Sequence, residues 1–561
     1  MTVPLPRKSL FQGGQLLVDK HISISCDAAL APAAHWWLDA TQHAFDVRTS
    51  ADAAVKLVMQ ISDEPLAPSG YHLTIDDAQV TVLASDLAGG FNAMQTLRQL
   101  GGPDAFRQAP LPGAHLSLPI GTIADEPGCA WRGVHLDVSR HFMVPRDVRR
   151  FIDLAAMHHL NVVQLHLTDD QGWRFESKRY PELTIVGSHR PTTAVGYSDD
   201  TDHIPHGGFY TQDDLREIVA FAKQRGVTVV PEIDLPGHAE AAIAAYPWLG
   251  TTKQPATVRT TWGISENVLD PGPNQVAFFC DVLDEVCDIF DSPFIHIGGD
   301  EVPLTRWQGN IAIEARAAAL NLLGADNKPD VARLHGWFLA QLAEHLRRRG
   351  RRAVVWDEAL GPDLQKDAVV MSWRGLRPAV KALHAGHDVV LAPEQYLYLN
   401  HRASDRPDEP APVGYLRRTE DVYAFDAGML AKVPGGSEFE TAHGGIDQVA
   451  SPSNGRVLGI QAEVWSEYLD NSRRVDYVTF PRLAAFSEAA WGSAPKDRDP
   501  GSPASTAFMA RLTKAHLPRL AAAGVEFRPL GGPLPWQMRP GLMSYGTGDL
   551  AAEIEAAGGL L

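Results

Sequence analysis

The chain has 561 residues, which is too long for one ordinary hydrophobic core and predicts at least two domains. Its formal net charge of −18 argues against nucleic acid as the main partner, because phosphate binding requires concentrated Lys and Arg. No apolar run approaches the roughly 18 residues of a membrane span, and the first residues lack the apolar core of a signal peptide. We therefore expect no membrane association and a cytoplasmic location, or secretion if a leader has been removed.

Residues 1–125 are predicted to form a small α+β domain. Segments such as AVKLVMQISD and YHLTIDDAQVTVLASD are typical of strands, and the alternation breaks at Asp76-Asp77 as in a hairpin. The segment GGFNAMQTLRQL then predicts a helix. The stretch IADEPGCAW, with its Pro and Gly, marks the end of this domain.

Residues 126–500 are predicted to form an α/β domain, a closed (β/α)8 barrel. Short runs rich in β-branched residues alternate with longer helical segments such as VPRDVRRFIDLAAMHHL, which is typical of parallel strand–helix units. The eight predicted strands are GVHLDVS, NVVQLHLTDD, GVTVVPEID, FIHIGGDE, RAVVWDE, AVVMSWRG, DVVLAPEQYLYL and VLGIQAEVWSE. Residues 172–210 and the Pro-rich segment 403–415 are predicted to be long loops on the top face. Residues 501–561 are expected to be a C-terminal extension packed on the outside of the barrel.

Polar and aromatic residues occur at the end of every predicted strand, where the active sites of such barrels form. A single residue of this kind more often has a structural role, but here all eight strand ends carry them. They are Asp137 and Arg140; His166, Asp169 and Asp170; Asp234 and His238; His296, Asp300 and Glu301; Trp356 and Asp357; Trp373; Tyr396, Tyr398 and Asn400; and Trp465 and Glu467.

This mixture of side chains points to a sugar ligand. Aromatic rings cover the C–H face of a pyranose, while carboxylates and a guanidinium take its hydroxyls in paired hydrogen bonds. Carboxylates also supply glycosidase chemistry, since one donates a proton to the leaving oxygen and others stabilise the developing positive charge. We expect Gly298 and Gly299 to end the fourth strand and to allow a sugar to approach closely, so that the adjacent Asp300 and Glu301 can address one substrate.

The motifs HLTDDQGWR, PEIDLPGHAEAA, HIGGDE, WDE, SWRG and QAEVWSE occur in this order along the chain. Together they resemble glycoside hydrolase family 20, the β-N-acetylhexosaminidases, and residues 1–125 are similar to the small domain that precedes the barrel in many members. The resemblance implies an exo-acting, retaining enzyme for small glycans ending in β-linked GlcNAc or GalNAc. In this mechanism the substrate's own 2-acetamido oxygen attacks the anomeric carbon and gives an oxazolinium intermediate. It implies no cofactor and no metal, and it leaves a homodimer open.

The resemblance also implies a role for individual residues. Glu301 would be the general acid and later the base, Asp300 would hold the acetamido N–H, and Tyr398 would donate a hydrogen bond to the attacking oxygen. Asp169 and His238 would form a supporting pair near the acid, with Asp234 orienting the His. The implied substrate-binding residues are Arg140, Trp356, Trp373, Asn400, Trp465 and Glu467.

Two positions depart from the family pattern. Asn400 stands where many members have Asp, and the loss of that charge leads us to hypothesise that the site tolerates an anionic 6-substituent. No Trp occurs between Trp373 and Trp465, where many bacterial members have one. Tyr415 or a neighbouring loop is the candidate for that wall of the pocket.

Other functions are compatible with parts of this pattern. His135, His166, His238 and His296 with Asp300 could suggest a metal-dependent barrel hydrolase, but three of these histidines fall within strands rather than past their ends. A non-catalytic sugar-binding protein would keep the aromatic walls and lose the acid. A lacto-N-biosidase-like member would need a wider pocket than the one that Arg140 and Glu467 imply.

Overall fold

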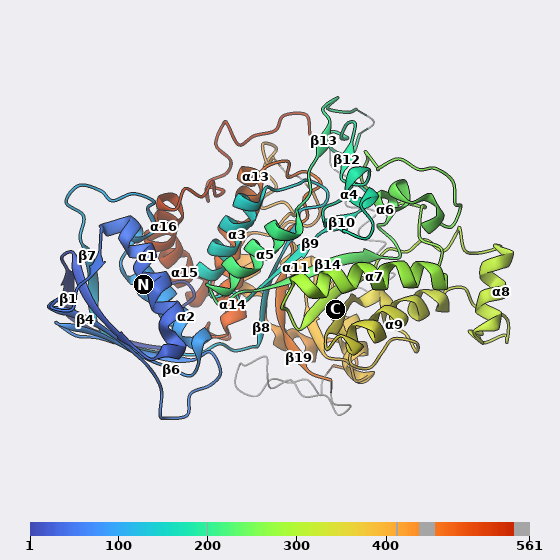
Figure 1. The fold of residues 1–561 in the computed structure, drawn as a ribbon. Helices are drawn as coiled ribbons and strands as arrows, with labels where there is room; N and C mark the ends of the chain where they lie inside the picture. The colour runs from blue at the N-terminus through green and yellow to red at the C-terminus, as the bar shows by residue number, and fades with distance from the viewer. Residues whose placement is uncertain (199, 411–412, 437–454, 543–561) are drawn as a thin grey trace.

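The computed structural model describes residues 1–198, 200–410, 413–436 and 455–542, and Figure 1 shows a sheet-containing N-terminal part beside a larger barrel. The N-terminal sheet has the order β1-β7-β5-β6-β4-β2-β3. Its strands are β1 (Lys8–Val18), β2 (His21–Cys26), β3 (Arg48–Thr49), β4 (Val55–Ile61), β5 (Tyr71–Ile75), β6 (Gln79–Ala84) and β7 (Leu116–Asp125). β5 and β6 pair antiparallel with Ile75 opposite Val80, so the predicted hairpin at Asp76-Asp77 is confirmed.

Alternation along these strands determines which face of the sheet is covered. In β5, Tyr71, Leu73 and Ile75 are buried while His72 and Thr74 are exposed. The helices α1 (Ala31–Phe45) and α2 (Leu87–Leu100) contact each other, and α2 contacts β5, β6 and β7. The N-terminal sheet therefore buries its apolar face under two helices.

Eight parallel strands close into a barrel, which confirms the predicted (β/α)8 fold. Closure is made by β19 and β8, whose register places Gln461 opposite Gly133. The strands are β8 (Trp131–Asp137), β9 (Val162–His166), β14 (Thr228–Leu235), β15 (Phe294–Gly298), β16 (Arg352–Trp356), β17 (Val369–Ser372), β18 (Val389–Leu391) and β19 (Val457–Ala462). The larger outer helices are α3 (Pro145–Met157), α5 (Gln212–Lys223), α7 (Pro273–Ile289), α9 (Arg333–Arg348), α10 (Leu376–His384), α13 (Ser472–Thr479) and α14 (Arg482–Trp491).

The outer helices form for reasons that are visible in the sequence. In α3, Pro145 occupies the first helical turn, and Val148, Phe151, Ile152 and Ala155 are buried at helical spacing. In α5, the Thr211 side chain accepts a hydrogen bond from the backbone N–H of Asp214, whose carboxylate accepts one from the Thr211 N–H. Each helix thus presents one apolar face to the barrel.

Two connections differ from regular strand–helix alternation. The seventh strand was expected to run through DVVLAPEQYLYL, but β18 ends at Leu391 and α11 (Glu394–Leu397) follows. Pro393 explains this difference, because proline cannot donate a ladder hydrogen bond and readily begins a helical turn. Residues 357–368, between β16 and β17, contain only the short helix η4 (Asp357–Ala359).

Short elements in the loops complete the top face of the barrel. Residues 172–210 contribute the two-residue strands β11 (Gly172–Trp173), β12 (His189–Arg190) and β13 (His206–Gly207) and the short helix α4 (Glu182–Ile185). The loops after β14 and β15 contain α6 (Glu240–Ala245), η3 (Pro247–Leu249) and α8 (Ile311–Ala319). After β18 come α12 (Thr419–Ala424) and η5 (Ala427–Lys432), with positions 411–412 of the predicted Pro-rich loop lying outside the described residues.

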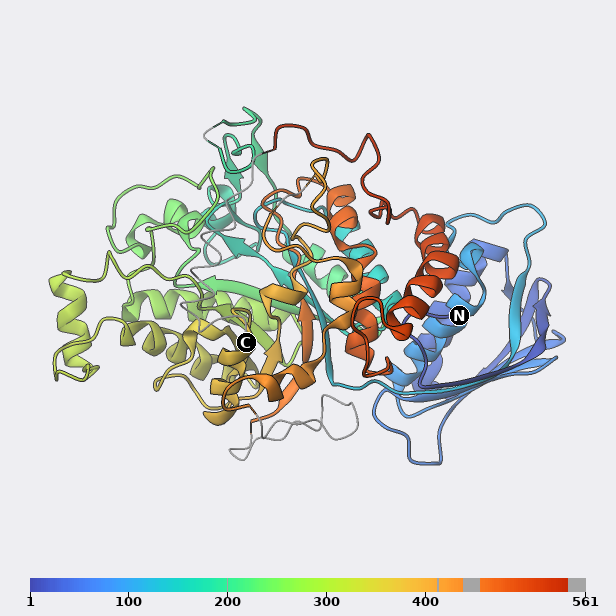
Figure 2. The same cartoon turned by 180° about the vertical axis from the view of Figure 1, so that it is seen from behind.

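The C-terminal segment contacts both main parts of the molecule. Its elements are α15 (Pro503–Arg511), the π-helical turn η9 (Leu512–His516) and α16 (Leu517–Ala522). Arg511 pairs with Glu488 of α14 at 2.6 Å, and Arg519 donates a hydrogen bond to the Gln99 carbonyl of α2 at 2.8 Å. Figure 2 shows these helices between the N-terminal sheet and the barrel. Residues 543–561 of the expected extension lie outside the described residues. No helix in the described part of the chain has the length and apolar character to span a membrane.

Candidate active site

A cavity of about 340 Å³ opens at the carboxyl ends of the barrel strands. Ten of the residues predicted from the sequence line it: Arg140, His238, Asp300, Glu301, Trp356, Trp373, Tyr398, Asn400, Trp465 and Glu467. The other two, Asp169 and Asp234, are buried next to the cavity rather than on its wall. The eight strand ends therefore bring residues that are far apart in the sequence to one place, as the barrel prediction required.

The end of β15 brings two adjacent carboxylates to one cavity. Gly298 and Gly299 have φ values of 68° and 102°, a region that favours glycine. We expected the glycines to let a sugar approach closely. At Gly298 the group that approaches is instead the Asp234 carboxylate, because a Cβ there would lie 1.6 Å from Asp234 Oδ1. Glu301 itself has a positive φ of 46°. Because the strand has ended, Asp300 and Glu301 both face the cavity.

His238 joins these two carboxylates to the rest of the site. Its Nε2 lies 3.3 Å from Glu301 Oε2 and 3.7 Å from Asp300 Oδ2, and its Nδ1 lies 3.3 Å from Asp169 Oδ1. Burial alone would lower the pKa of His238, but the Asp169, Glu301 and Asp300 carboxylates raise it well above its ordinary value. The ring is therefore an imidazolium that faces acidic groups on both sides.

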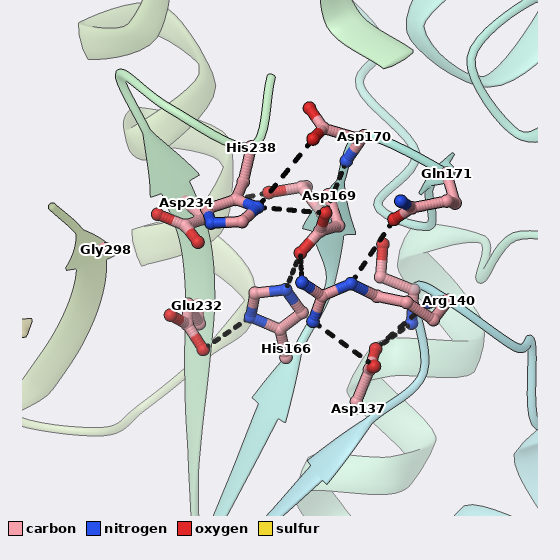
Figure 3. A network of polar contacts seen from close by, with 12 residues as sticks. Asp137, Arg140, His166, Asp169, Asp170, Gln171, Glu232, Asp234, His238 and Gly298 are labelled. Carbon is pink, nitrogen blue, oxygen red and sulfur yellow. Dashed lines mark hydrogen bonds and ion pairs between the residues drawn. The ribbon is translucent and has the colours of Figure 1, made fainter. Parts of the chain in front are cut away.

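The position of Asp234 differs from the expectation. We expected it to orient His238, but the carboxylate on His238 Nδ1 belongs to Asp169, and neither Asp234 oxygen has a hydrogen-bond partner among the described residues. Burial raises the pKa of Asp234 well above its usual range, and the nearby Asp300 carboxylate adds to the rise. The Asp234 carboxyl group is therefore packed against Gly298, with both oxygens buried (Figure 3).

A layer of ion pairs supports the site from inside the barrel (Figure 3). Asp169 Oδ2 lies 2.8 Å from Arg140 Nη2 and 2.7 Å from His166 Nε2. The other nitrogen of His166 lies 2.8 Å from Glu232, whose second oxygen accepts a hydrogen bond from the Trp356 indole at 2.9 Å. Fixed charges of both signs thus hold Arg140, Asp169 and Trp356 in place.

Opposing effects act on the pKa of Asp300. Burial raises the pKa of Asp300 to about 6; the His238 imidazolium opposes this shift, and the Glu301 carboxylate adds to it. Its Oδ1 is buried and has no hydrogen-bond partner among the described residues. A carboxylate that is desolvated and incompletely paired is well suited to bind an amide N–H and to stabilise positive charge.

The aromatic walls are arranged around Trp465. The Arg140 guanidinium lies 4.8 Å from the Trp465 ring centroid. The Trp356 and Tyr398 rings lie 6.1 Å and 6.3 Å from the same ring. The Trp373 ring lies nearly parallel to that of Tyr398, with centroids 6.4 Å apart. These rings form an aromatic surface beside the Asp300 and Glu301 carboxyl groups.

Some residues lie elsewhere than sequence reasoning suggested. Tyr415, a candidate for the missing wall, packs against His401, and Tyr396 packs against Phe425. Among the described residues, neither lines the cavity. Asn400 does, and its buried Oδ1 lacks a hydrogen-bond partner in the described structure.

Six further residues line the cavity and were missed: Gln171, Tyr197, Gly263, Ile264, Glu394 and His401. Gln171 lies within the motif HLTDDQGWR, which was an available signal. Tyr197 lies in the predicted long loop, but loop sequence gives no periodicity that would indicate its direction. Gly263 and Ile264 come from the loop that follows β14, for which we found no sequence signal.

Several buried groups are close enough to share a metal ion, including His135 with His166 and Glu232, and Asp234 with His238 and Asp300. In the first group His166 pairs with Glu232, and in the second His238 pairs with Asp300. The contacts between histidine and carboxylate therefore have an explanation as ion pairs in the described structure.

Comparisons with known proteins agree with this geometry. Residues 129–494 match the family described as "Glycosyl hydrolase family 20, catalytic domain", and residues 1–126 match "Glycosyl hydrolase family 20, domain 2". The chain is 35% identical to a β-hexosaminidase of Porphyromonas gingivalis over 508 residues, which is 87% of this chain and 60% of that protein. A β-hexosaminidase of Vibrio furnissii is 34% identical over 492 residues, 86% of this chain and 75% of that protein.

Solved structures show the same relationship. The family 20 exo β-N-acetylglucosaminidase of Vibrio harveyi, in complex with N-acetylglucosamine, superposes with a TM-score of 0.78 at 30% identity, covering 94% of this chain and 78% of that one. The family 20 β-N-acetylhexosaminidase of Streptomyces coelicolor gives a TM-score of 0.75 at 26% identity, covering 96% and 98%. With both of its domains matched, the chain belongs to glycosyl hydrolase family 20 and is a glycoside hydrolase.

Proposed function

We propose that the chain is an exo-acting, retaining β-N-acetylhexosaminidase that removes terminal β-linked GlcNAc or GalNAc through an oxazolinium intermediate. The observation that carries the proposal is the placement of Asp300 and Glu301 on one cavity, with His238 within 3.7 Å of both. Arg140 and Glu467 both line the cavity, which supports a closed pocket for a single sugar residue over the wider pocket of a lacto-N-biosidase. The relatives of similar fold are β-hexosaminidases, which supports the same substrate class.

In the proposed first step, the acetamido oxygen of the substrate attacks the anomeric carbon while the glycosidic bond breaks. Glu301 donates its proton to the leaving oxygen and becomes a carboxylate. That new negative charge develops 3.3 Å from the His238 imidazolium, which is held by Asp169 on its other side. This arrangement stabilises the charge on Glu301 as the reaction proceeds.

Asp300 and Tyr398 act on the acetamido group in this proposal. Asp300 accepts a hydrogen bond from the acetamido N–H and stabilises the positive charge of the oxazolinium ring. Tyr398 donates a hydrogen bond to the attacking oxygen, and burial raises the pKa of Tyr398 well above its ordinary value, so that it keeps its proton. In the second step the Glu301 carboxylate activates water, which opens the oxazolinium ring with net retention.

Variants of the two carboxylates test the proposal. We expect the wild-type chain to release nitrophenol from p-nitrophenyl β-N-acetylglucosaminide and to be inhibited by an oxazoline mimic. Glu301→Gln should lose most of this activity, and azide should restore part of it on a substrate with a good leaving group. Asp300→Asn should be equally slow and should not respond to azide, because it impairs the internal nucleophile. Failure of the mimic to inhibit would contradict substrate assistance.

A further inference from the structure

A second cavity of about 320 Å³ lies outside the catalytic pocket. Its walls come from the β19–α13 connection, from α13 and from the segment that follows α16. In Figure 2 this last segment runs past α13. Tyr468 lines this cavity, directly follows Glu467 of the catalytic pocket, and has its ring 6.1 Å from that of Tyr197. The two cavities are therefore neighbours, lined by consecutive residues and by two tyrosines whose rings are in contact.

The second cavity has a positive lining in a chain whose formal net charge is −18. Arg473, Arg474 and Arg539 line it. Asp470 is shared between two of them, with one oxygen 2.7 Å from Arg474 Nε and the other 3.5 Å from Arg539 Nη2. The backbone N–H of the exposed Arg473 donates to the Asn471 side chain, but its guanidinium makes no ion pair or hydrogen bond with another described residue. Burial lowers the pKa of the Arg539 guanidinium, the neighbouring Arg474 lowers it further, and Asp470 opposes the shift.

The cavity also has an aromatic wall whose orientation is fixed. Trp536 is 71% exposed, yet its indole N–H donates a hydrogen bond to Glu526 Oε1 at 2.9 Å. Gln537 Nε2 donates to the same oxygen at 3.0 Å. Glu526 is the only carboxylate among the residues described as lining the cavity, and it is engaged in holding the Trp536 ring.

An exposed tryptophan alone or a pair of surface arginines alone would need no explanation. Their convergence on one cavity is more specific, because an aromatic face suits the C–H face of a sugar and guanidinium groups suit a carboxylate or sulfate. We propose that this cavity binds an acidic saccharide, with its anionic group on Arg473 and Arg474 and its ring against Trp536. This site goes beyond the proposed hydrolytic function and does not depend on it.

Binding of small probes tests the site directly. The full-length protein is titrated calorimetrically with glucuronic acid and with N-acetylgalactosamine 4-sulfate, with an oxazoline mimic present to occupy the catalytic pocket. Neutral N-acetylglucosamine is the uncharged comparison. We expect saturable binding of at least one anionic probe, at least fivefold weaker binding of the neutral sugar, and a loss of affinity when salt is raised from about 50 to about 500 mM.

Substitutions of Arg473 and Trp536 test whether the anionic probe binds in this cavity. Arg473→Ala should weaken the anionic probe at least fivefold, and it leaves intact the helix cap, because the Asn471 side chain bonds to the backbone of residue 473. Trp536→Ala should weaken binding similarly, while Trp536→Phe should retain most of it. Arg48→Ala is the matched control, since this side chain is 65% exposed on β3 of the N-terminal sheet and does not line the cavity, and it should have no effect.

Three outcomes would overturn the proposal: no saturable binding of either anionic probe, equal affinity for neutral N-acetylglucosamine, or binding that Arg473→Ala and Trp536→Ala leave unchanged. Because the readout is binding, a failure here is distinct from a failure of the hydrolytic proposal.

Discussion

Replacing Asp300 by Asn should abolish catalysis and at the same time stabilise the folded protein. The pKa of Asp300 rises from its ordinary value of 3.8 to about 6 on folding, so the folded state holds this proton more tightly than the unfolded chain does. Folding stability therefore falls as the pH rises from about 4 to about 6, and above that range the folded state carries the whole cost of ionising a buried carboxylate. Asparagine has no charge to bury.

The shift of about two pKa units sets the size of the effect. At about 1.4 kcal/mol per unit, ionised Asp300 destabilises the folded protein by about 3 kcal/mol at pH 8 and by only about 0.5 kcal/mol at pH 4. No discount for solvent screening applies, because Asp300 is only 8% exposed. For a cooperative unit of this size the difference corresponds to an increase in Tm of roughly 2–4 °C at pH 8.

Thermal unfolding of wild type and Asp300→Asn at pH 8 and at pH 4 measures this directly. Asp19→Asn is the matched control, because its side chain is 89% exposed and the same change of charge there should leave Tm unaltered. An Asn variant that is no more stable than wild type at pH 8, or one that gains equally at both pH values, would refute the reasoning.

Three further outcomes are expected. Because Asp300 must be ionised to act and its pKa is about 6, kcat/KM should fall as the pH drops below about 6, and a profile that stays flat to about pH 4.5 would contradict this. Asn400→Asp should reduce the preference for a 6-sulfated over an unsubstituted substrate by about tenfold, through repulsion worth about 1.4 kcal/mol; equal preference in both proteins would reject the hypothesis. Activity should survive dialysis against EDTA, whereas loss that Zn²⁺ or Mn²⁺ restores would favour the metal-dependent alternative.

The barrel was predictable because its signal is periodic and repeated. Each strand is a short run of β-branched residues, and helices such as α3 carry their apolar residues at helical spacing. The seventh strand was predicted too long because apolar and aromatic residues resume at Tyr396, beyond Pro393 and within the α11 turn. Apolar content alone does not distinguish a buried strand from a buried helical turn, and only the proline carried that information.

The candidate site was predictable to the extent that it lies at strand ends. The topology of a barrel determines where Arg140, Asp300 and Trp465 must lie, so their convergence could be inferred without coordinates. Tyr197 and Ile264 reach the same cavity from loops, and their direction depends on tertiary contacts that leave no local pattern. The pairing of Asp169 with His238 was expected from the family resemblance, but the sequence could not show that Asp234 makes no hydrogen bond to this histidine.

Three features near the end of β15 depart from the usual preferences for backbone conformation and for burial of charged groups. Glu301 has a positive φ, Asp234 packs against a glycine that no other residue could replace, and Asp300 is ionised in a buried position. Each of these features costs folding free energy, and a chain selected for stability alone would lack all three. The three features lie side by side, because Asp234 is on β14 next to Gly298 and Asp300 and Glu301 follow the end of β15. Part of this cost falls on Asp300 and Glu301, which the proposed reaction uses, and this is why Asp300→Asn is expected both to stabilise the fold and to abolish activity.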